Sequence, residues 1–128
     1  MNNRTARGAF RLAEQVGQFG YFAAIELVVE ISTGSHGEVR IELPQELPSH
    51  WRNGLVFGID YALGHARIQS SGQNISCVRV ENLETNPVDT SSVLLAFVAA
   101  KAVCSAIHIE PPARFTFVPK DGAFLFPK

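Results

Sequence analysis

The stretch VGQFGYFAAIELVVEI, residues 16–31, sets a loop containing two glycines directly in front of an apolar segment. Glycine permits the backbone conformations of tight turns, and a segment rich in β-branched and aromatic residues is typical of a strand. We therefore predict a loop over 17–20 that leads into a strand over 21–31.

This loop has two interpretations. Gln18 and Phe19 can contact an RNA base, because an exposed ring stacks on a base and an amide hydrogen-bonds to its edge. Alternatively the loop only turns the chain, with Phe19 folded back onto the protein. The second interpretation is favoured by the lack of clustered cations around the loop, because phosphate affinity rests on Lys and Arg.

Two further alternating segments lie on either side of this stretch. Residues 8–15, GAFRLAEQ, and residues 38–43, EVRIEL, alternate apolar and polar side chains with the period of a strand. The turn residues STGSHG separate the strand over 21–31 from the strand over 38–43. In order, the three segments predict an antiparallel meander.

Two segments have helical spacing. Apolar residues in LPSHWRNGLVFGIDYALG predict a helix that begins at Ser49 as N-cap and ends at Gly64 as C-cap. Gly54 and Gly58 lie four residues apart and so share one face, which we expect to approach the sheet closely. A second helix, over 91–106, is so uniformly small and apolar that it should be heavily buried.

A polar loop precedes the second helix. It follows a strand over 75–83 and reads LETNPVDTSS, and either Asp89 or Thr90 is expected to cap the helix. Because a helix N-terminus also attracts phosphate, this loop joins the first one as a candidate RNA-binding segment. The candidate contacts at the two loops are Gln18, Phe19, Asn86 and Thr90.

The last part of the chain predicts a short strand in IHIEPP and then a hairpin over 113–128, turned at PKDG. Both faces of this hairpin are largely apolar. One face can pack on the domain, and the other predicts either a contact with a second copy or partner, or further cover within the chain. The candidate interface residues are Phe115, Phe117, Phe124 and Phe126.

These elements predict an α+β fold. We expect a two-layer sandwich with a mostly antiparallel four-stranded sheet, two helices on one face, and a C-terminal β-hairpin. The domain spans 8–112, and the hairpin extension over 113–128 packs on the same domain. A chain of 128 residues fits this single unit.

Charge and composition limit the class of function. The chain has 11 Lys and Arg and 12 Asp and Glu, which gives a net charge of -1. It therefore lacks the basic excess that would predict strong nonspecific binding to nucleic acid. Arg4, Arg7 and Arg11 form a local basic group that is either a solvated edge or a small patch. We expect no signal peptide and no membrane-spanning segment, because the N-terminus lacks an apolar core and the longest apolar run is short.

Cysteine and histidine give no catalytic or metal signature. Cys77 and Cys104 read as reduced thiols of a cytoplasmic protein, although a disulfide between them is left open by sequence alone. Cys104 and His108 are spaced as one helical turn, but a thiol in an alanine-rich buried helix is usually inert. The four histidines lack zinc-site spacing. We therefore expect no enzymatic activity, no metal and no cofactor.

Two stretches resemble the fourth domain of translation elongation factor G. VGQFGYFAAIELVVEI is similar to that family's Gly-Gln-Tyr-Gly loop and the strand after it. VRVENLETNPVDTSSVLLAFVAAKAV is similar to the family's strand, its loop ending in Val-Asp-Ser-Ser, and the helix of small residues that follows. The likeness covers about residues 8–112.

The resemblance implies a fold like the second domain of ribosomal protein S-five. It also implies that the loops 16–21 and 84–90 lie side by side at one end, corresponding to the loops with which the elongation factor enters the small-subunit decoding site and contacts tRNA and mRNA. The chain has no Gly-x-x-x-x-Gly-Lys-Ser/Thr loop, so we expect no GTP binding of that kind. The expected function is a stand-alone, non-enzymatic module that binds RNA or the ribosome, or alternatively an assembly domain that forms a homodimer through its C-terminal hairpin.

Overall fold

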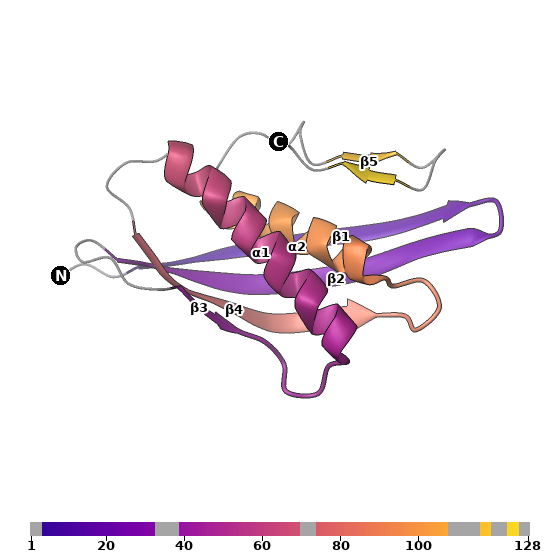
Figure 1. Cartoon of the computed structure of the whole chain (residues 1–128), viewed down its shortest axis with the longest axis horizontal. Coiled ribbons are helices and arrows are strands. Elements are labelled where there is room, and N and C mark those ends of the chain that lie inside the picture. Colours follow the sequence, from indigo (N-terminus) through magenta and orange to yellow (C-terminus); the bar gives the residue numbers. More distant parts are fainter. Residues whose placement is uncertain (1–3, 33–38, 70–73, 108–115, 119–122, 126–128) are drawn as a thin grey trace.

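A four-stranded sheet with two helices against one face forms the body of the molecule in the computed structural model (Figure 1). The structure describes residues 4–32, 39–69, 74–107, 116–118 and 123–125. The elements in chain order are β1 (Arg4–Val16), β2 (Phe19–Ser32), β3 (Arg40–Glu42), α1 (Ser49–Gln69), β4 (Asn74–Thr85), α2 (Ser92–Ile107), β5 (Thr116–Val118) and β6 (Ala123–Leu125). The α+β fold class is confirmed. The short strand expected in IHIEPP lies almost wholly outside the described residues.

The strand order in the sheet is β1-β2-β4-β3. β2 pairs antiparallel with both β1 and β4, whereas β3 lies parallel to β4 at the far edge. The predicted meander is therefore wrong, because β3 does not pair with β2. Alternation identifies a strand but not its neighbour, and here α1 supplies the crossover that a parallel β3–β4 pair needs.

The sheet has one covered face and one open face. Alternate residues such as Ile25, Leu27 and Val29 point toward the helices and are fully buried. The open face carries charged side chains, with Arg7 Nη1 2.8 Å from Glu81 Oε1 and Arg79 Nη1 3.1 Å from Glu30 Oε2. The hydrogen bond from Arg7 lowers the pKa of the Glu81 carboxyl. The Arg7–Glu81 pair is exposed and the Arg79–Glu30 pair is partly buried, so both contribute only modestly to the free energy of unfolding.

Glycines bring the two helices into close contact. A Cβ on Gly58 would lie 2.1 Å from the Ala96 carbonyl oxygen, and one on Gly54 would lie 2.3 Å from the Ser92 carbonyl oxygen. The two glycines therefore face α2 and not the sheet, which corrects the expected partner. The spacing of four residues fixed their shared face but could not identify what packs against it.

Helix α1 is longer than the sequence predicts, and it does not have the predicted caps. The Arg52 N–H donates the first hydrogen bond of the helix to the Pro48 carbonyl. Ser49 is therefore the first residue of the helix and not its N-cap. Gly64 lies inside the helix, which continues to Gln69. No helix in the described part of the chain is both long and apolar enough to cross a membrane.

The C-terminal hairpin packs on the body through aromatic rings. Phe117 and Phe124 stack across the β5–β6 pair with ring centroids 4.7 Å apart. Tyr21 of β2 lies 5.0 Å from the Phe117 ring, and Phe97 of α2 lies 5.1 Å from the Phe124 ring. These two phenylalanines are thus partly covered within the chain, while Phe115 and Phe126 lie outside the described residues.

Both cysteines are free and buried. Burial raises the pKa of the Cys77 and Cys104 thiols, which disfavours the reactive thiolate form. His108, the expected neighbour of Cys104, lies outside the described residues.

Candidate functional site at the tip of the sheet

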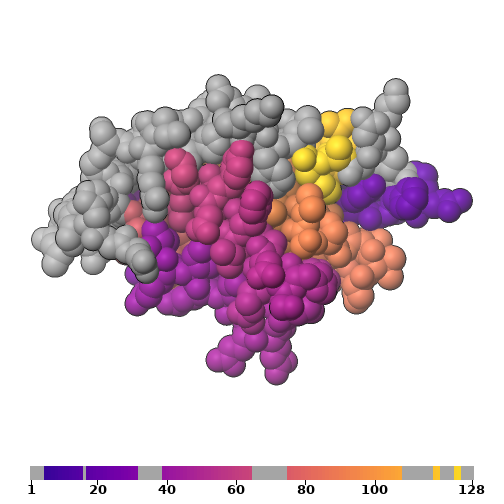
Figure 2. Space-filling model, viewed as in Figure 1, coloured from indigo at the N-terminus to yellow at the C-terminus, as the bar shows by residue number. Residues whose placement is uncertain are grey.

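The two predicted loops meet at one end of the molecule. β4 ends with Thr85 opposite Ala23, so the end of the β1–β2 hairpin projects beyond it (Figure 1). The chain after β4 then turns through 86–90 alongside the hairpin, and the space-filling view shows both segments at the same end (Figure 2). We call residues 13–22 and 84–92 together the tip. The expectation that the two loops lie side by side is confirmed.

The first half of the tip is a tight turn. Val16 pairs with Phe19, so Gly17 and Gln18 alone make the connection, and Gly17 has a φ of 60°. A glycine with positive φ at the first of two turn residues is typical of the type II′ hairpin. The expected loop over 17–20 is therefore shorter, with Phe19 and Gly20 already in β2. Phe19 is 69% exposed, so its ring is not folded back onto the protein.

The second half of the tip is organised by Asn86. Its Oδ1 accepts hydrogen bonds from the Val88 N–H at 2.9 Å and the Asp89 N–H at 3.3 Å. Its carbonyl accepts from the Thr90 N–H at 2.9 Å. This is the local bonding by which asparagine favours turns. It leaves Val88 89% exposed at the outer end of the loop.

Thr90 joins the two halves. Its hydroxyl donates to the Phe22 carbonyl at 2.6 Å and accepts from the Asn86 N–H at 2.8 Å. The Phe22 N–H in turn donates to the Asp89 carbonyl at 3.2 Å. Thr90 is only 8% exposed, and its hydroxyl is already bonded on both sides. We therefore assign Thr90 a structural role in holding the tip together rather than a direct contact with a ligand.

Gly20 lies close to the Asp89 side chain of the second loop. A Cβ at this position would lie 2.7 Å from Asp89 Oδ2. The second glycine of the opening stretch therefore makes room for the neighbouring loop, while the first one, Gly17, makes the turn.

The cap of α2 is Ser91, one residue beyond the two expected candidates. Ser91 Oγ accepts from the Leu94 N–H at 3.1 Å, and the Ser91 carbonyl accepts from the Leu95 N–H at 3.0 Å. Asp89 and Thr90 were expected as caps because their side chains suit that role. The Thr90 hydroxyl is instead hydrogen-bonded to β2, and α2 begins at Ser92, directly after Ser91.

Replacing Ser91 with alanine should lower the free energy of unfolding by about 1 kcal/mol, the usual effect of losing an N-cap hydroxyl. Ser105→Ala is the matched control, because Ser105 is exposed within α2. It should leave stability unchanged or raise it by about 0.5 kcal/mol through helix propensity. Urea unfolding followed by circular dichroism measures both. Equal losses in the two variants would show that Ser91 is not the cap.

A hollow of about 410 Å³ lies between the two halves of the tip. Tyr21 and Phe22 contribute aromatic surface to it, and Gln15, Asn86 and Asp89 contribute polar groups. Such a mixture suits a flat, partly polar group that both stacks and hydrogen-bonds. The tip contains three carboxylates, Glu14, Glu84 and Asp89, and no Lys or Arg. The tip therefore has no cation of its own, although Arg11 of β1 lies over the ring of Phe22, which lines the hollow.

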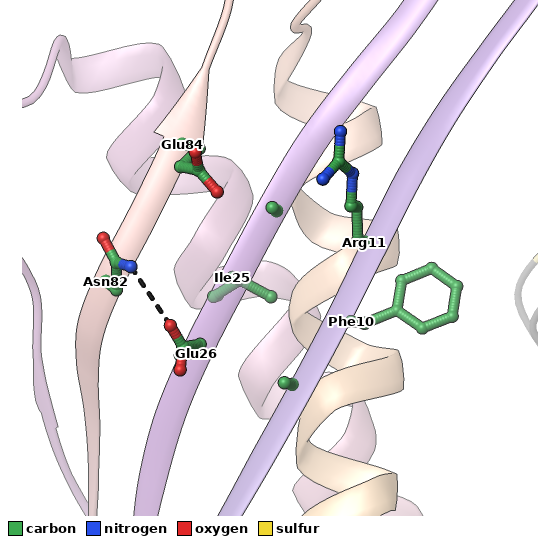
Figure 3. A pocket seen from close by; sticks show the side chains of 8 residues that line it. Phe10, Arg11, Ile25, Glu26, Asn82 and Glu84 are labelled. Carbon is green, nitrogen blue, oxygen red and sulfur yellow. Dashed lines mark hydrogen bonds between the residues drawn. The ribbon is translucent and has the colours of Figure 1, made fainter.

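A second hollow, of about 250 Å³, lies on the open face of the sheet (Figure 3). Ala24 on β2 leaves a gap between Arg11 on β1 and Glu84 on β4, because all three stand in one row of the sheet. Glu26 is hydrogen-bonded to Asn82 at the next row, at 3.1 Å. Arg11 lies 5.4 Å over the Phe22 ring, which turns this cation toward the tip without placing it inside.

The structure thus brings Gln18, Phe19 and Asn86 together as exposed residues of one tip. Sequence reasoning missed Val88 and the hollow between the two halves of the tip. An apolar residue directly after Asn-Pro in a turn was a signal for Val88, whereas the hollow depends on how the two loops pack. Among the described residues, no group of three or more His, Cys, Asp or Glu side chains is placed to hold a metal ion.

Comparison with known proteins supports the fold alone. No protein-family model matches the chain, and no curated protein matches it. A crystal structure of a protein from Thermus thermophilus matches 77% of this chain with a TM-score of 0.56 and 19% sequence identity. The match covers 15% of that chain, so the fold described here is similar to one small part of a much longer protein.

Proposed function

We propose that this protein is a non-enzymatic binding module that recognises structured RNA of the ribosome through its tip. The observation that carries the proposal is the convergence of two distant loops on one projecting end, where Phe19 is exposed and a hollow with aromatic and polar lining residues lies between the loops. The resemblance to the fourth domain of elongation factor G also supports RNA binding through the tip. Activity of that kind would need neither GTP nor a cofactor.

Stacking would supply most of the affinity. Phe19 is held at the end of a tight hairpin, so little conformational freedom is lost when a base stacks on its ring. A stacked base contributes roughly 1–3 kcal/mol in single-stranded RNA complexes. Bases that are unpaired in loops and bulges are the ones that proteins read in this way.

Hydrogen bonds would supply selectivity. The Asn86 oxygen is used within the loop, but its amide N–H groups point to no partner within the described part of the chain. Gln15 and Asp89 add an amide and a carboxylate at the edge of the same hollow. Because the tip has no Lys or Arg, binding should depend only weakly on salt concentration.

Phe19→Ala is expected to weaken cosedimentation of the full chain with small ribosomal subunits about tenfold, through loss of one stacking contact. Phe57→Ala is the matched control, because Phe57 is 55% exposed but lies on α1, outside the tip. Asn86→Asp keeps the oxygen that organises the loop while removing the amide donor, and should also weaken binding. Equal binding by the Phe19 and Phe57 variants would refute a role for the tip.

A protein partner is the second candidate, and the charge of the tip is the observation that favours it. Three carboxylates around two exposed apolar residues, Phe19 and Val88, suit an apolar pocket with a basic rim. Binding to intact subunits but not to deproteinised ribosomal RNA would select this candidate. The homodimer expected through the C-terminal hairpin has less support, since Phe117 and Phe124 already pack within the chain.

We place this activity in the cytoplasm. Two buried, unpaired cysteines are typical of a reducing compartment, where disulfides are rare.

A further inference from the structure

We infer that the hollow at the tip selects one unpaired guanine of the RNA, which is read by the carboxylate of Asp89. This assignment depends on the proposed function and adds to it the identity of one base. The guanine is not the base that stacks on Phe19. Side chains alternate along β2, so Phe19 and Phe22 lie on opposite faces of the hairpin, and of these two only Phe22 lines the hollow.

The Asp89 carboxylate lies on the open face of the sheet, the same face as the Phe22 side chain. A Cβ on Gly20 would lie 2.7 Å from Asp89 Oδ2, and Gly20 precedes Phe22 by two residues, so both positions face one side of β2. Gln15 of β1 pairs with Gly20 and lines the same hollow. A ring, an amide and a carboxylate from three segments therefore border one space.

A carboxylate without a partner is the main free polar group of this hollow. Asp89 is partly buried, and its carboxylate has no hydrogen bond or ion pair within the described part of the chain. Gln15 already donates from Nε2 to the Gly17 carbonyl at 3.0 Å. The Asn86 oxygen is used within the loop, which leaves its amide as a donor. The hollow thus offers two acceptor oxygens on one carboxylate and an amide donor from Asn86.

Guanine matches this set of groups. It is the one RNA base with two adjacent donors on its Watson–Crick edge, N1–H and the N2 amino group, and its O6 is an acceptor that suits the Asn86 amide. A carboxylate has two acceptor oxygens and no donor, so it bonds two adjacent N–H groups at once. Adenine and cytosine place a ring-nitrogen acceptor beside their amino group, and uracil places a carbonyl on each side of N3–H. Each of these acceptors would face a carboxylate oxygen.

Arg11 favours a nucleotide over a basic side chain of a protein. Its guanidinium lies 5.4 Å from the centroid of the Phe22 ring. A second cation at this ring would be repelled by Arg11, whereas the phosphate of a bound nucleotide would be attracted. The hollow volume of about 410 Å³ also suits a flat ring system.

NMR titration of the full chain with uridine pentamers tests the assignment. The central nucleotide is guanosine, inosine or adenosine, and the salt concentration is held fixed. We expect the guanosine pentamer to bind about tenfold more tightly than the adenosine pentamer, which is the effect of one bidentate contact. Inosine lacks the N2 amino group, so its pentamer should bind about fivefold more weakly than the guanosine pentamer. The shifted amides should include those of 20–22 and 86–90.

Asp89→Asn replaces one acceptor oxygen with a donor and should remove the preference for guanosine over adenosine. Asp60→Asn is the matched control, because it makes the same change at an exposed carboxylate of α1, outside the tip, and should keep the preference. The comparison of the three pentamers uses the unaltered chain, so it does not depend on the folding of either variant.

Equal binding of the three pentamers would overturn the guanine assignment, while binding to ribosomal subunits that depends on Phe19 would still support the proposed function. A guanosine preference that survives Asp89→Asn would also overturn it, because another group would then read the base. If N-acetylargininamide shifts the amides of the tip and no pentamer does, the hollow takes a basic side chain and the assignment is wrong. If neither RNA nor ribosomal subunits bind, the proposed function fails together with the assignment.

Discussion

Replacing Gly58 with alanine is expected to lower the free energy of unfolding by about 3 kcal/mol, at the upper end of the usual overpacking penalty. In an exposed helix the same change would stabilise by about 1 kcal/mol, because alanine has the higher helix propensity. Here the added Cβ would lie 2.1 Å from the Ala96 carbonyl oxygen, which belongs to the backbone of α2. A backbone atom cannot rotate aside, so the two helices must separate.

Gly64→Ala is the matched control in the same helix. A Cβ on Gly64 meets no atom within 4 Å, and its φ is not in the positive range that favours glycine. This variant should gain about 0.5–1 kcal/mol. Guanidinium unfolding of both variants measures the difference. A Gly58→Ala protein as stable as the Gly64→Ala protein would show that the helices are not packed as described.

Thr90→Val is expected to lower the free energy of unfolding by about 2–3 kcal/mol, although valine has nearly the shape of threonine. The substitution leaves the Phe22 carbonyl and the Asn86 N–H without the hydroxyl that bonds both of them. Because Thr90 is buried, water does not readily replace that hydroxyl. The loss should be felt at the tip first, since both partners belong to it.

Thr85→Val makes the same chemical change at the end of β4, where the Thr85 hydroxyl has no hydrogen-bond partner within the described part of the chain. It should alter stability by less than about 0.5 kcal/mol, because it removes no hydrogen bond within the described part of the chain. Hydrogen exchange at 19–22 and 86–90 would report local opening in the Thr90 variant. Unchanged exchange there, together with unchanged unfolding, would contradict the role assigned to Thr90.

The strands, the helices and the packed hairpin could be predicted from the sequence because each has a local signal. Alternation marks β1 and β2, and uniform small apolar residues mark α2 as buried. The pairing of β3 could not be predicted, because a short alternating segment fits beside any neighbour. Gly54 and Gly58 show the same limit, since their spacing gives a face but not the helix that packs against it.

At the tip, the exposed residues were easier to predict than the buried one. Gln18, Phe19 and Asn86 lie at turns, where glycine and asparagine have known backbone preferences. Thr90 carries the side chain of a helix cap, and only the tertiary position of Phe22 draws its hydroxyl away from α2. Ser91 then caps α2, so the residue that holds the tip together and the residue that caps the helix are direct neighbours in the sequence.

Photo-crosslinking from the tip tests the central claim most directly. A benzoyl-phenylalanine side chain placed at Phe19 of the full chain, and in a control at Phe57, would be irradiated with small ribosomal subunits. We predict an adduct with ribosomal RNA from position 19 and none from position 57. Adducts of equal yield from both positions, or none from position 19, would contradict the proposal that this end of the sheet is the recognition surface.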